Sequence, residues 1–472
     1  MSDLVKSCLI ILAILLLGAG IRIHQGAADV RFHADEALYS TYARNAAVHG
    51  YWMLNGPVDK PPLSIYANAL SMHLFAARST DVIDIPLRAG EVAAKIPNIF
   101  AGMILIALIY ALAKRLYSTQ TATLAALITA VSPYAIAFSA SVFTDMLMLT
   151  LMIAALLTAS HGKPVWTGGL IALSIWTKPQ GILFLPLTWA YLKHGKSRFI
   201  TMLIIGAGML WLWDTIRPET SFWTLGAAHI NPGRLFSSPD EWLPRLSEWL
   251  RHSQKLLGWQ VINWSSITLG IITAIKKRRD YLLLLMASGY FAFHWFNAYP
   301  TFDRYMLPLV PLLAILAARA IPPRYVWITG LILLISIFTT YDPRESNSNG
   351  YITVSAWLND KPLGTIIYNP LLGWEMGYYK GAWSDKRWVH YPEPEIQAQD
   401  ALLNPDPAPR YFLIPAENPQ PWITALQEVE FSVTLVYEQD NLLVYELIPP
   451  WGDASGVESS CAAAALGCDS FE

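Results

Sequence analysis

The chain has 472 residues, of which 54% are apolar and only 14% carry a charge, and its mean hydropathy is positive. Soluble globular chains of this length are more polar, so the composition predicts a polytopic membrane protein with lipids among its partners. The formal net charge of −2 excludes the strongly basic footprint that nucleic-acid-binding proteins carry.

Apolar runs of roughly spanning length follow one another along the first 340 residues. A helix needs about 20 mostly apolar residues to cross a bilayer, so the runs predict about eleven spans in a membrane domain over residues 1–340. Lys178 and Pro179 interrupt one short pair of runs, which leaves an error of about two in this count. The runs lie at 7–24, 92–113, 119–139, 145–160, 164–177, 180–192, 199–214, 257–275, 281–297, 304–320 and 325–340.

The first run lacks a small-residue cleavage site, so we interpret it as a retained span and not as a signal peptide. Basic residues gather in alternate loops, such as Lys114-Arg115 and Lys276 to Arg279, whereas the short loops between them hold only Lys178 and Arg304. Cytoplasmic loops carry the excess of Lys and Arg, so the N-terminus is predicted to be cytoplasmic. The segments then expected outside the plasma or inner membrane are 25–90, 215–256 and everything after 341.

The first outer loop, residues 25–90, is long enough to hold two short helices. Asp35 and Glu36 would begin the first helix, which runs to His49 with its bulky side chains on one face. The second helix follows Pro61 and Pro62, because proline is tolerated in a first helical turn. We expect both helices to lie at the membrane surface.

The remaining outer segments differ in composition. Residues 215–256 are rich in Trp, Pro and Arg, as expected of an aromatic belt at the level of the lipid headgroups. After the last apolar run, short alternating elements predict a small extracytoplasmic α/β domain over residues 341–450, followed by a disordered tail at 451–472. The expected strands are 365–368, 387–391, 411–414, 431–437 and 442–447, the last two as a hairpin.

The acidic pair Asp35 and Glu36 follows the first span. In the structural interpretation, these carboxylates complement the dipole of the helix that they begin. In the functional interpretation, Asp35 is a general base that removes a proton from an acceptor hydroxyl as it attacks C1 of a sugar. Glu36 would orient Asp35, bind the acceptor or hold a cation. His33 is expected to be a loop histidine near the same cavity and not a metal ligand, because no His/Cys/Asp cluster has ligand spacing.

Lys60 follows Asp59 and precedes a proline, which biases its backbone to an extended conformation. Its ammonium either reaches the lipid headgroups or neutralises a phosphate, and we expect the phosphate of a polyprenyl-phosphate leaving group. Arg304 is a candidate second phosphate contact, with a pair to Asp303 as the equally weighted alternative. Asp145, at the outer mouth of a span, is costly next to hydrocarbon, so it and Asp59 are candidate cavity residues.

Four motifs carry a family resemblance. The chain resembles an integral-membrane glycosyltransferase of the C-type superfamily, in the glycosyltransferase family 39-like group of protein O-mannosyltransferases and the lipid A aminoarabinose transferase. The resemblance implies inverting transfer of a hexose or pentose from a polyprenyl-phosphate sugar donor, with Asp35 as the base, Lys60 at the donor phosphate and Asp145 in the same cavity. The motifs are Ala34-Asp35-Glu36, Asp59-Lys60-Pro61-Pro62-Leu63, Thr144-Asp145 and Arg304-Tyr305-Met306-Leu307-Pro308-Leu309-Val310-Pro311.

Two departures from the family pattern leave the sugar and the acceptor open. Aminoarabinose-type members have Glu-Lys-Pro-Pro where this chain has Asp59 before Lys60, and mannosyltransferases add a histidine shortly after the acid pair, which this chain lacks. The acceptor is therefore a protein, lipid or glycan of the cell envelope. No cofactor is required, because no nucleotide-binding motif occurs between a strand and a helix, and a divalent cation is compatible with the reaction.

The alternative from another class is a transporter or flippase of lipid-linked sugars, in which charged residues inside the membrane mark a substrate path. It predicts interrupted helices in two related halves, and the sequence shows no such pairing. The sequence therefore favours the enzyme.

Overall fold

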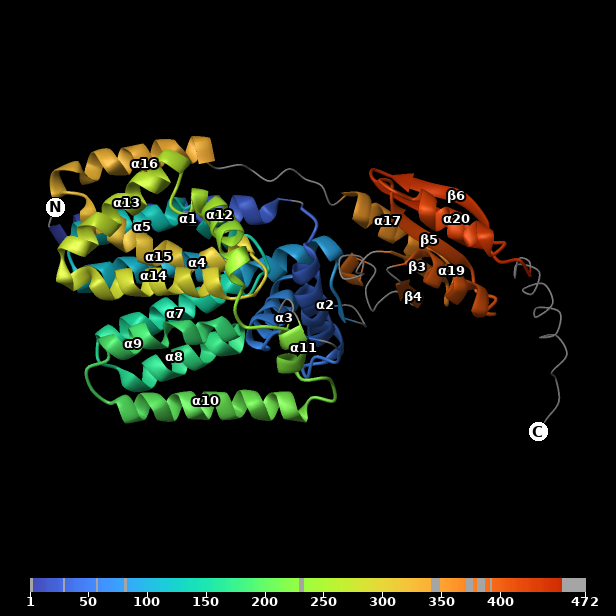
Figure 1. Cartoon of the computed structure of the whole chain (residues 1–472), viewed down its shortest axis with the longest axis horizontal. Coiled ribbons are helices and arrows are strands. Elements are labelled where there is room, and N and C mark those ends of the chain that lie inside the picture. Colours follow the sequence, from blue (N-terminus) through green and yellow to red (C-terminus); the bar gives the residue numbers. More distant parts are fainter. Residues whose placement is uncertain are drawn as a thin grey trace. The chain divides into compact units, whose positions relative to one another are not determined.

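The computed structural model describes residues 3–28, 30–56, 58–79, 83–228, 233–340, 349–370, 377–379, 387–390 and 393–451 (Figure 1). The chain divides into two compact units. Residues 1–28 and 42–344 form the first, which we call the membrane unit, and residues 29–41 and 345–472 form the second, the C-terminal unit. The predicted disordered tail lies outside the described residues beyond Trp451.

Every apolar run folds as helix. Among the described residues, three helices are long and apolar enough to cross a membrane, or up to five if each of two bent pairs is one span. The count of eleven is not confirmed, because several runs form helices of fewer than 18 residues and others bend at prolines. The long helices are α1 (Asp3–Ala27), α4 (Leu87–Leu116) and α10 (Lys196–Ile216).

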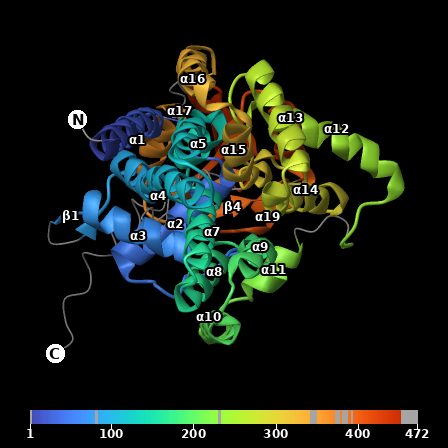
Figure 2. The same cartoon turned by 90° about the vertical axis from the view of Figure 1, so that its left-hand side faces the viewer.

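The shorter helices surround these three. One bent pair is α5 (Thr119–Val131) with α6 (Pro133–Ser139), at 57°. The other is α15 (Leu309–Ala320) with the stretch Pro323–Ser336, at 107°, and this stretch holds most of α16 (Val326–Thr340). Figure 2 shows α7 beside α8 and α10 beyond α8. The other elements are α7 (Asp145–Ser160), α8 (Pro164–Thr177), η1 (Pro179–Phe184), α9 (Leu185–Tyr191), α13 (Gln260–Lys276), η4 (Arg278–Asp280), α14 (Tyr281–Phe296), η5 (Asp303–Met306) and η6 (Pro323–Tyr325).

A buried arginine forms hydrogen bonds to both sides of the break between α5 and α6. The guanidinium of Arg22, fully buried on α1, donates to the carbonyls of Thr129 and Ala130 at 3.1 and 2.9 Å, and to Ser139 Oγ at 3.1 Å. These carbonyls lie at the end of α5, where a helix leaves its last acceptors unsatisfied. A Cβ at Gly102 would come within 2.1 Å of Ser139 Oγ, so only glycine lets α4 approach this joint.

The two predicted helices of the first outer loop are present as α2 (Ala34–His49) and α3 (Leu63–Phe75). One face of α3 buries Ile65 and Met72, whereas Leu70 and Leu74 on another face are more than half exposed, as suits a helix at a membrane surface. A short hairpin, β1 (Arg78–Ser79) and β2 (Ile83–Asp84), leads to α4. The second outer loop holds α11 (Phe222–Ala228), η2 (Pro239–Glu241), α12 (Trp242–His252) and η3 (Ser253–Lys255).

The C-terminal unit is a mixed five-stranded sheet in the order β4-β3-β5-β7-β6, with helices on both faces. β3 pairs in parallel with β4 and β5, and β7 pairs antiparallel with β5 and β6, so the predicted terminal hairpin is present. Alternate residues face opposite layers: Tyr368 and Phe412 pack toward α19 and α20, whereas Ile367 and Leu413 pack toward α17. The elements are α17 (Asn349–Asn359), β3 (Ile366–Asn369), β4 (Arg387–His390), α19 (Pro394–Leu403), β5 (Arg410–Pro415), α20 (Gln420–Glu428), β6 (Ser432–Gln439) and β7 (Leu442–Ile448).

Candidate active site

A buried ion pair joins the start of α7 to the end of α8. Lys178 Nζ lies 2.6 Å from Asp145 Oδ1, and both side chains are only 2% exposed. The two helices are neighbours joined by a short connection, so the first residue of α7 lies beside the residue that follows α8. A charge is retained in so dry a place only when a partner compensates it. The pair therefore marks a polar centre inside the helical body.

Aromatic side chains from three elements surround this ion pair. Lys178 Nζ lies 4.7 Å from the ring centre of Tyr305 on η5. The Tyr305 ring is 5.4 Å from that of His294 on α14, which is 4.4 Å from the ring of Tyr290. From α12, Trp249 Nε1 donates to the His294 carbonyl at 3.0 Å. A cation over a ring face gains electrostatic stabilisation, so the Tyr305 ring supports the buried ammonium.

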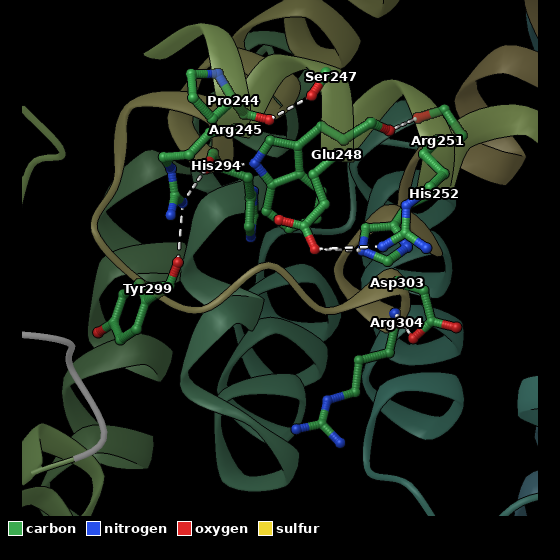
Figure 3. Close-up of polar contacts among 12 residues, drawn as sticks. Pro244, Arg245, Ser247, Glu248, Arg251, His252, His294, Tyr299, Asp303 and Arg304 are labelled. Atoms are coloured by element: carbon green, nitrogen blue, oxygen red, sulfur yellow. Dashed lines mark hydrogen bonds and ion pairs between the residues drawn. The ribbon is translucent and has the colours of Figure 1, made fainter. Parts of the chain in front are cut away.

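Arg304 lies at the end of the loop from α14 to η5, and Arg245 forms hydrogen bonds to the start of this loop. Arg245 on α12 donates to the carbonyls of His294, Trp295 and Tyr299, which lie at the end of α14 and just after it (Figure 3). Basic side chains commonly satisfy the last carbonyls of a helix in this way. The contact holds the connection from α14 to η5, and therefore the backbone that carries Arg304.

The guanidinium of Arg304 packs between aromatic rings. Its central carbon lies 4.8 Å from the ring centre of Phe143 and 4.5 Å from that of Phe302. Asp303 Oδ1 accepts the backbone N–H of Arg304 at 2.7 Å, and Figure 3 shows the guanidinium extending away from the Asp303 carboxylate. The same carbon lies 5.9 Å from the ring centre of Tyr305, the ring that Lys178 Nζ approaches to 4.7 Å. Asp303 therefore contacts the backbone of Arg304, and a phosphate contact of the guanidinium stays a prediction.

Lys60 joins the same cluster from the first outer loop. Its ammonium forms an ion pair with Asp59, the two side chains being 19% and 14% exposed, and it lies within electrostatic range of Lys178. Each of the two lysines is therefore paired with an acid, Lys60 with Asp59 and Lys178 with Asp145. Four predicted site residues of the membrane unit lie around one centre.

A glycine and a buried tyrosine shape the loop before Lys60. Gly56 has φ of +131°, and a Cβ there would lie 2.4 Å from Tyr42 Oη. Arg217 Nη2 donates to the Gly56 carbonyl at 3.4 Å. Burial raises the pKa of the Tyr42 hydroxyl well above its usual value; Arg217 opposes the shift and Asp59 adds to it. Tyr42 therefore stays neutral and packs against a turn that only glycine fits.

The acidic pair lies in the C-terminal unit, where its two carboxylates differ. Glu36, 5% exposed, accepts the backbone N–H of His33 at 3.0 Å, and His33 Nδ1 accepts the backbone N–H of Asp35 at 3.2 Å. These two bonds satisfy amide groups at the start of α2, as in a capping box. Glu36 and His33 thus have a structural role, whereas Asp35 is partly exposed at the helix start.

A cavity of about 310 Å³ opens between η1, α9 and α14. Its lining is almost entirely apolar, with Leu187, Leu285 and Phe293 among its walls. Tyr290 also lines it, and the same residue contacts His294 and lies within electrostatic range of Asp145. The cavity therefore borders the aromatic residues that lie around the ion pair.

Comparisons with known proteins find chains of similar fold. A family model described as dolichyl-phosphate-mannose-protein mannosyltransferase matches residues 59–218, a segment that holds Lys60, Asp145 and Lys178. ArnT from Cupriavidus metallidurans bound to undecaprenyl phosphate superposes with a TM-score of 0.67 at 14% identity, over 94% of this chain and 98% of that one. The chain has the C-type membrane glycosyltransferase fold.

Another solved structure of this fold class is also similar. The Archaeoglobus fulgidus oligosaccharyltransferase in complex with Zn and sulfate superposes with a TM-score of 0.56 at 13% identity, over 92% of this chain and 72% of that one. No curated protein sequence matches the chain. The predicted resemblance to the C-type superfamily is confirmed, and the match to ArnT extends it through the C-terminal unit.

Sequence reasoning missed Lys178 as a site residue. It was treated only as a break between two short apolar runs, although an ionisable residue at membrane depth is by itself a sign of function. Its partner Asp145 was identified, but the two are 33 positions apart and nothing local links them.

Metal ligands were not expected from the sequence. In the part of the chain that the structure describes, no group of three or more His, Cys, Asp or Glu side chains is placed to hold a metal ion.

Proposed function

We propose that the chain is a membrane glycosyltransferase that moves a sugar from a polyprenyl-phosphate donor to an acceptor hydroxyl at the outer face of the cell membrane, with inversion at C1. The observation that carries this proposal is that Lys178 and Arg304 lie over the same Tyr305 ring, next to the aromatic residues that border an apolar cavity. An anionic headgroup on a long apolar chain is the ligand that such a pairing suits. Two proteins of similar fold were solved with undecaprenyl phosphate and with dolichol-phosphate.

The cationic cluster would stabilise the leaving group. As the bond from C1 to the phosphate oxygen breaks, negative charge grows on that oxygen, and fixed positive groups in a dry site stabilise it more in the transition state than in the ground state. Arg304 offers a planar fork for two phosphate oxygens, and Lys60 offers a point charge. Asp145 and Asp59 keep the two lysines in place before the donor arrives.

The apolar cavity would hold the first part of the lipid. Its walls on α9 and α14 are helix surfaces of the membrane unit, so a prenyl chain could pass from the bilayer into it without crossing polar groups. Burial of apolar surface contributes roughly 25 cal/mol per Å², which makes the chain a substantial source of donor affinity. The sugar would then project beyond the phosphate.

Asp35 would act as the general base. Its carboxylate accepts the proton of the acceptor hydroxyl while that oxygen attacks C1 from the side opposite the phosphate, and the polyprenyl phosphate departs with the bonding electron pair. Glu36 supports this role indirectly, because its carboxylate accepts a hydrogen bond from the backbone N–H of His33 at the start of the same helix.

The test uses the full chain purified in lipid nanodiscs. Co-purified polyprenyl-phosphate sugars are identified by mass spectrometry, and transfer to candidate protein, lipid and glycan acceptors is then measured. We expect Asp35→Asn to lower kcat by roughly 10²- to 10⁴-fold, and Lys60→Ala to raise the donor KM. Glu395→Gln, which changes an acid in the first turn of α19, is the matched control and should leave transfer unchanged.

Two outcomes would reject parts of the proposal. Full transfer by Asp35→Asn would reject Asp35 as the general base. An unchanged donor KM in Lys60→Ala would reject Lys60 as the phosphate contact. A flippase is distinguished in the same preparation, because it would move donor between leaflets without an acceptor and with no dependence on Asp35. The two bent helix pairs are the feature of this fold that such a transporter would use.

A further inference from the structure

The segment that carries the acidic pair is built into the C-terminal unit. Residues 29–41 pack with residues 345–472, although α1, directly before them in the chain, belongs to the membrane unit. Whatever holds residues 31 and 32 therefore influences where the start of α2 lies. This inference rests on the proposed role of Asp35.

Three tyrosines of the C-terminal unit hold Arg31 and Phe32. We call Tyr351, Tyr378 and Tyr379 the tyrosine cluster. The Phe32 N–H donates to Tyr379 Oη at 3.0 Å, and the Phe32 ring meets the Tyr378 ring edge-on with centres 4.9 Å apart. Phe32, Tyr378 and Tyr379 are each at most 1% exposed, so this contact is shielded from solvent like the core of a domain.

The rest of the cluster extends the contact. Arg31 donates to Tyr351 Oη, and its guanidinium carbon lies 4.6 Å from the centre of the same ring. The Tyr351 and Tyr379 rings are 5.9 Å apart, and those of Tyr378 and Tyr379 are 5.3 Å apart at 87°. The tyrosine cluster thus contacts residues 31 and 32 through both their backbone and their side chains.

Three hydrogen bonds hold His33, the residue after Phe32, to the first turn of α2. His33 donates its N–H to Glu36 and accepts the Asp35 N–H on Nδ1, and its carbonyl accepts the Ala37 N–H at 2.9 Å. These bonds fix the backbone of the first helical turn relative to residue 32. A displacement of Phe32 would therefore move the Asp35 backbone with it.

We propose that Tyr379 and Tyr378 are positioning residues for Asp35. A base transfers a proton only within hydrogen-bond reach of its substrate, and small misplacements in an active site lower rates steeply. The proposed donor contacts, Lys60, Lys178 and Arg304, belong to the membrane unit. Loosening the tyrosine cluster should therefore affect kcat and leave the donor KM unchanged.

The central variant is Tyr379→Phe, which keeps the buried ring and removes the oxygen that accepts the Phe32 N–H. The matched control is Tyr368→Phe on β3, also a buried tyrosine of this unit, whose oxygen accepts from Arg410 Nη1 at 3.3 Å. Phe32→Leu is a second variant that keeps the N–H donor and removes the ring from Tyr378. Each protein is studied as the full chain in nanodiscs.

Two readouts are needed, one kinetic and one structural. We expect Tyr379→Phe to lower kcat by roughly three- to tenfold, the factor that one lost neutral hydrogen bond represents, with donor KM within twofold of the parent. Amide hydrogen exchange of residues 31–41 should become faster in the same protein. Phe32→Leu should change both readouts in the same direction, and Tyr368→Phe should change neither.

The outcomes separate this inference from the proposed function. If Asp35→Asn is inactive but Tyr379→Phe keeps the parent kcat and the parent exchange rates, the positioning role is overturned and the base remains. An equal loss of kcat in Tyr368→Phe would also overturn it, because the effect would then be general to the unit. If Asp35→Asn is fully active, the base itself is rejected, whatever the exchange data show.

Discussion

The buried pair of Lys178 and Asp145 gives a prediction that separates stability from activity. Replacing Lys178 by Met removes the ammonium 2.6 Å from Asp145 Oδ1 and leaves a carboxylate that is 2% exposed. Within the described part of the chain, the other carboxylate oxygen, Oδ2, is already buried without a hydrogen-bond partner. Breaking a buried pair by removing one partner costs about 3–5 kcal/mol of unfolding free energy, because the remaining charge is uncompensated.

Removing both charges should restore stability. In the double variant Lys178→Met with Asp145→Leu, no ion stays buried, and apolar replacements of buried pairs are typically neutral or stabilising by about 1–4 kcal/mol. Transfer should remain low in the double variant, since the cluster around the donor phosphate has lost one of its cations. The expected pattern is therefore stability lost and regained, with activity lost in both variants.

The assay is thermal unfolding in nanodiscs followed by tryptophan fluorescence, with sugar transfer measured on the same samples. Arg234→Ala is the control, because its pair with Glu241 is about 37% exposed on each side and should contribute at most about 1 kcal/mol. The reasoning is refuted if Lys178→Met is no less stable than Arg234→Ala. It is also refuted if the double variant is as unstable as Lys178→Met.

Three further predictions concern residues that shape the fold around the site. Arg22→Met leaves the carbonyls at the end of α5 without their donors and should cost about 3 kcal/mol in a denaturant titration; a loss under 1 kcal/mol would contradict the role of this residue as the seal of the α5–α6 break. Gly56→Ala meets Tyr42 Oη at 2.4 Å and a φ of +131°, so it should raise the donor KM by displacing the Lys60 loop, and an unchanged KM would count against that coupling. Arg245→Ala releases the carbonyls after α14 and should raise the donor KM through Arg304, with hydrogen exchange of residues 297–304 as the structural check.

Local patterns accounted for most of the secondary structure. The run at 145–160 is α7 with the same bounds, and the strands predicted at 431–437 and 442–447 are the β6–β7 hairpin. Apolar periodicity and turn residues act over a few positions, which is why they could be read along the chain. The number of spans could not be predicted in the same way. Breaks at Pro133 and Pro323 produce bent helix pairs, and the geometry of these pairs depends on packing.

The order of residues along the chain was enough to predict which reactive groups are present: an acid pair after the first span, a lysine before two prolines, an acid and an arginine at later span entries, and a strongly apolar helical body. Which of these groups meet depends on how the chain packs. Lys178 finds Asp145 across 33 positions, and Phe32 finds Tyr379 across 347. Such contacts depend on how helices and sheet pack, and packing is a property of the whole fold that no short stretch of residues contains.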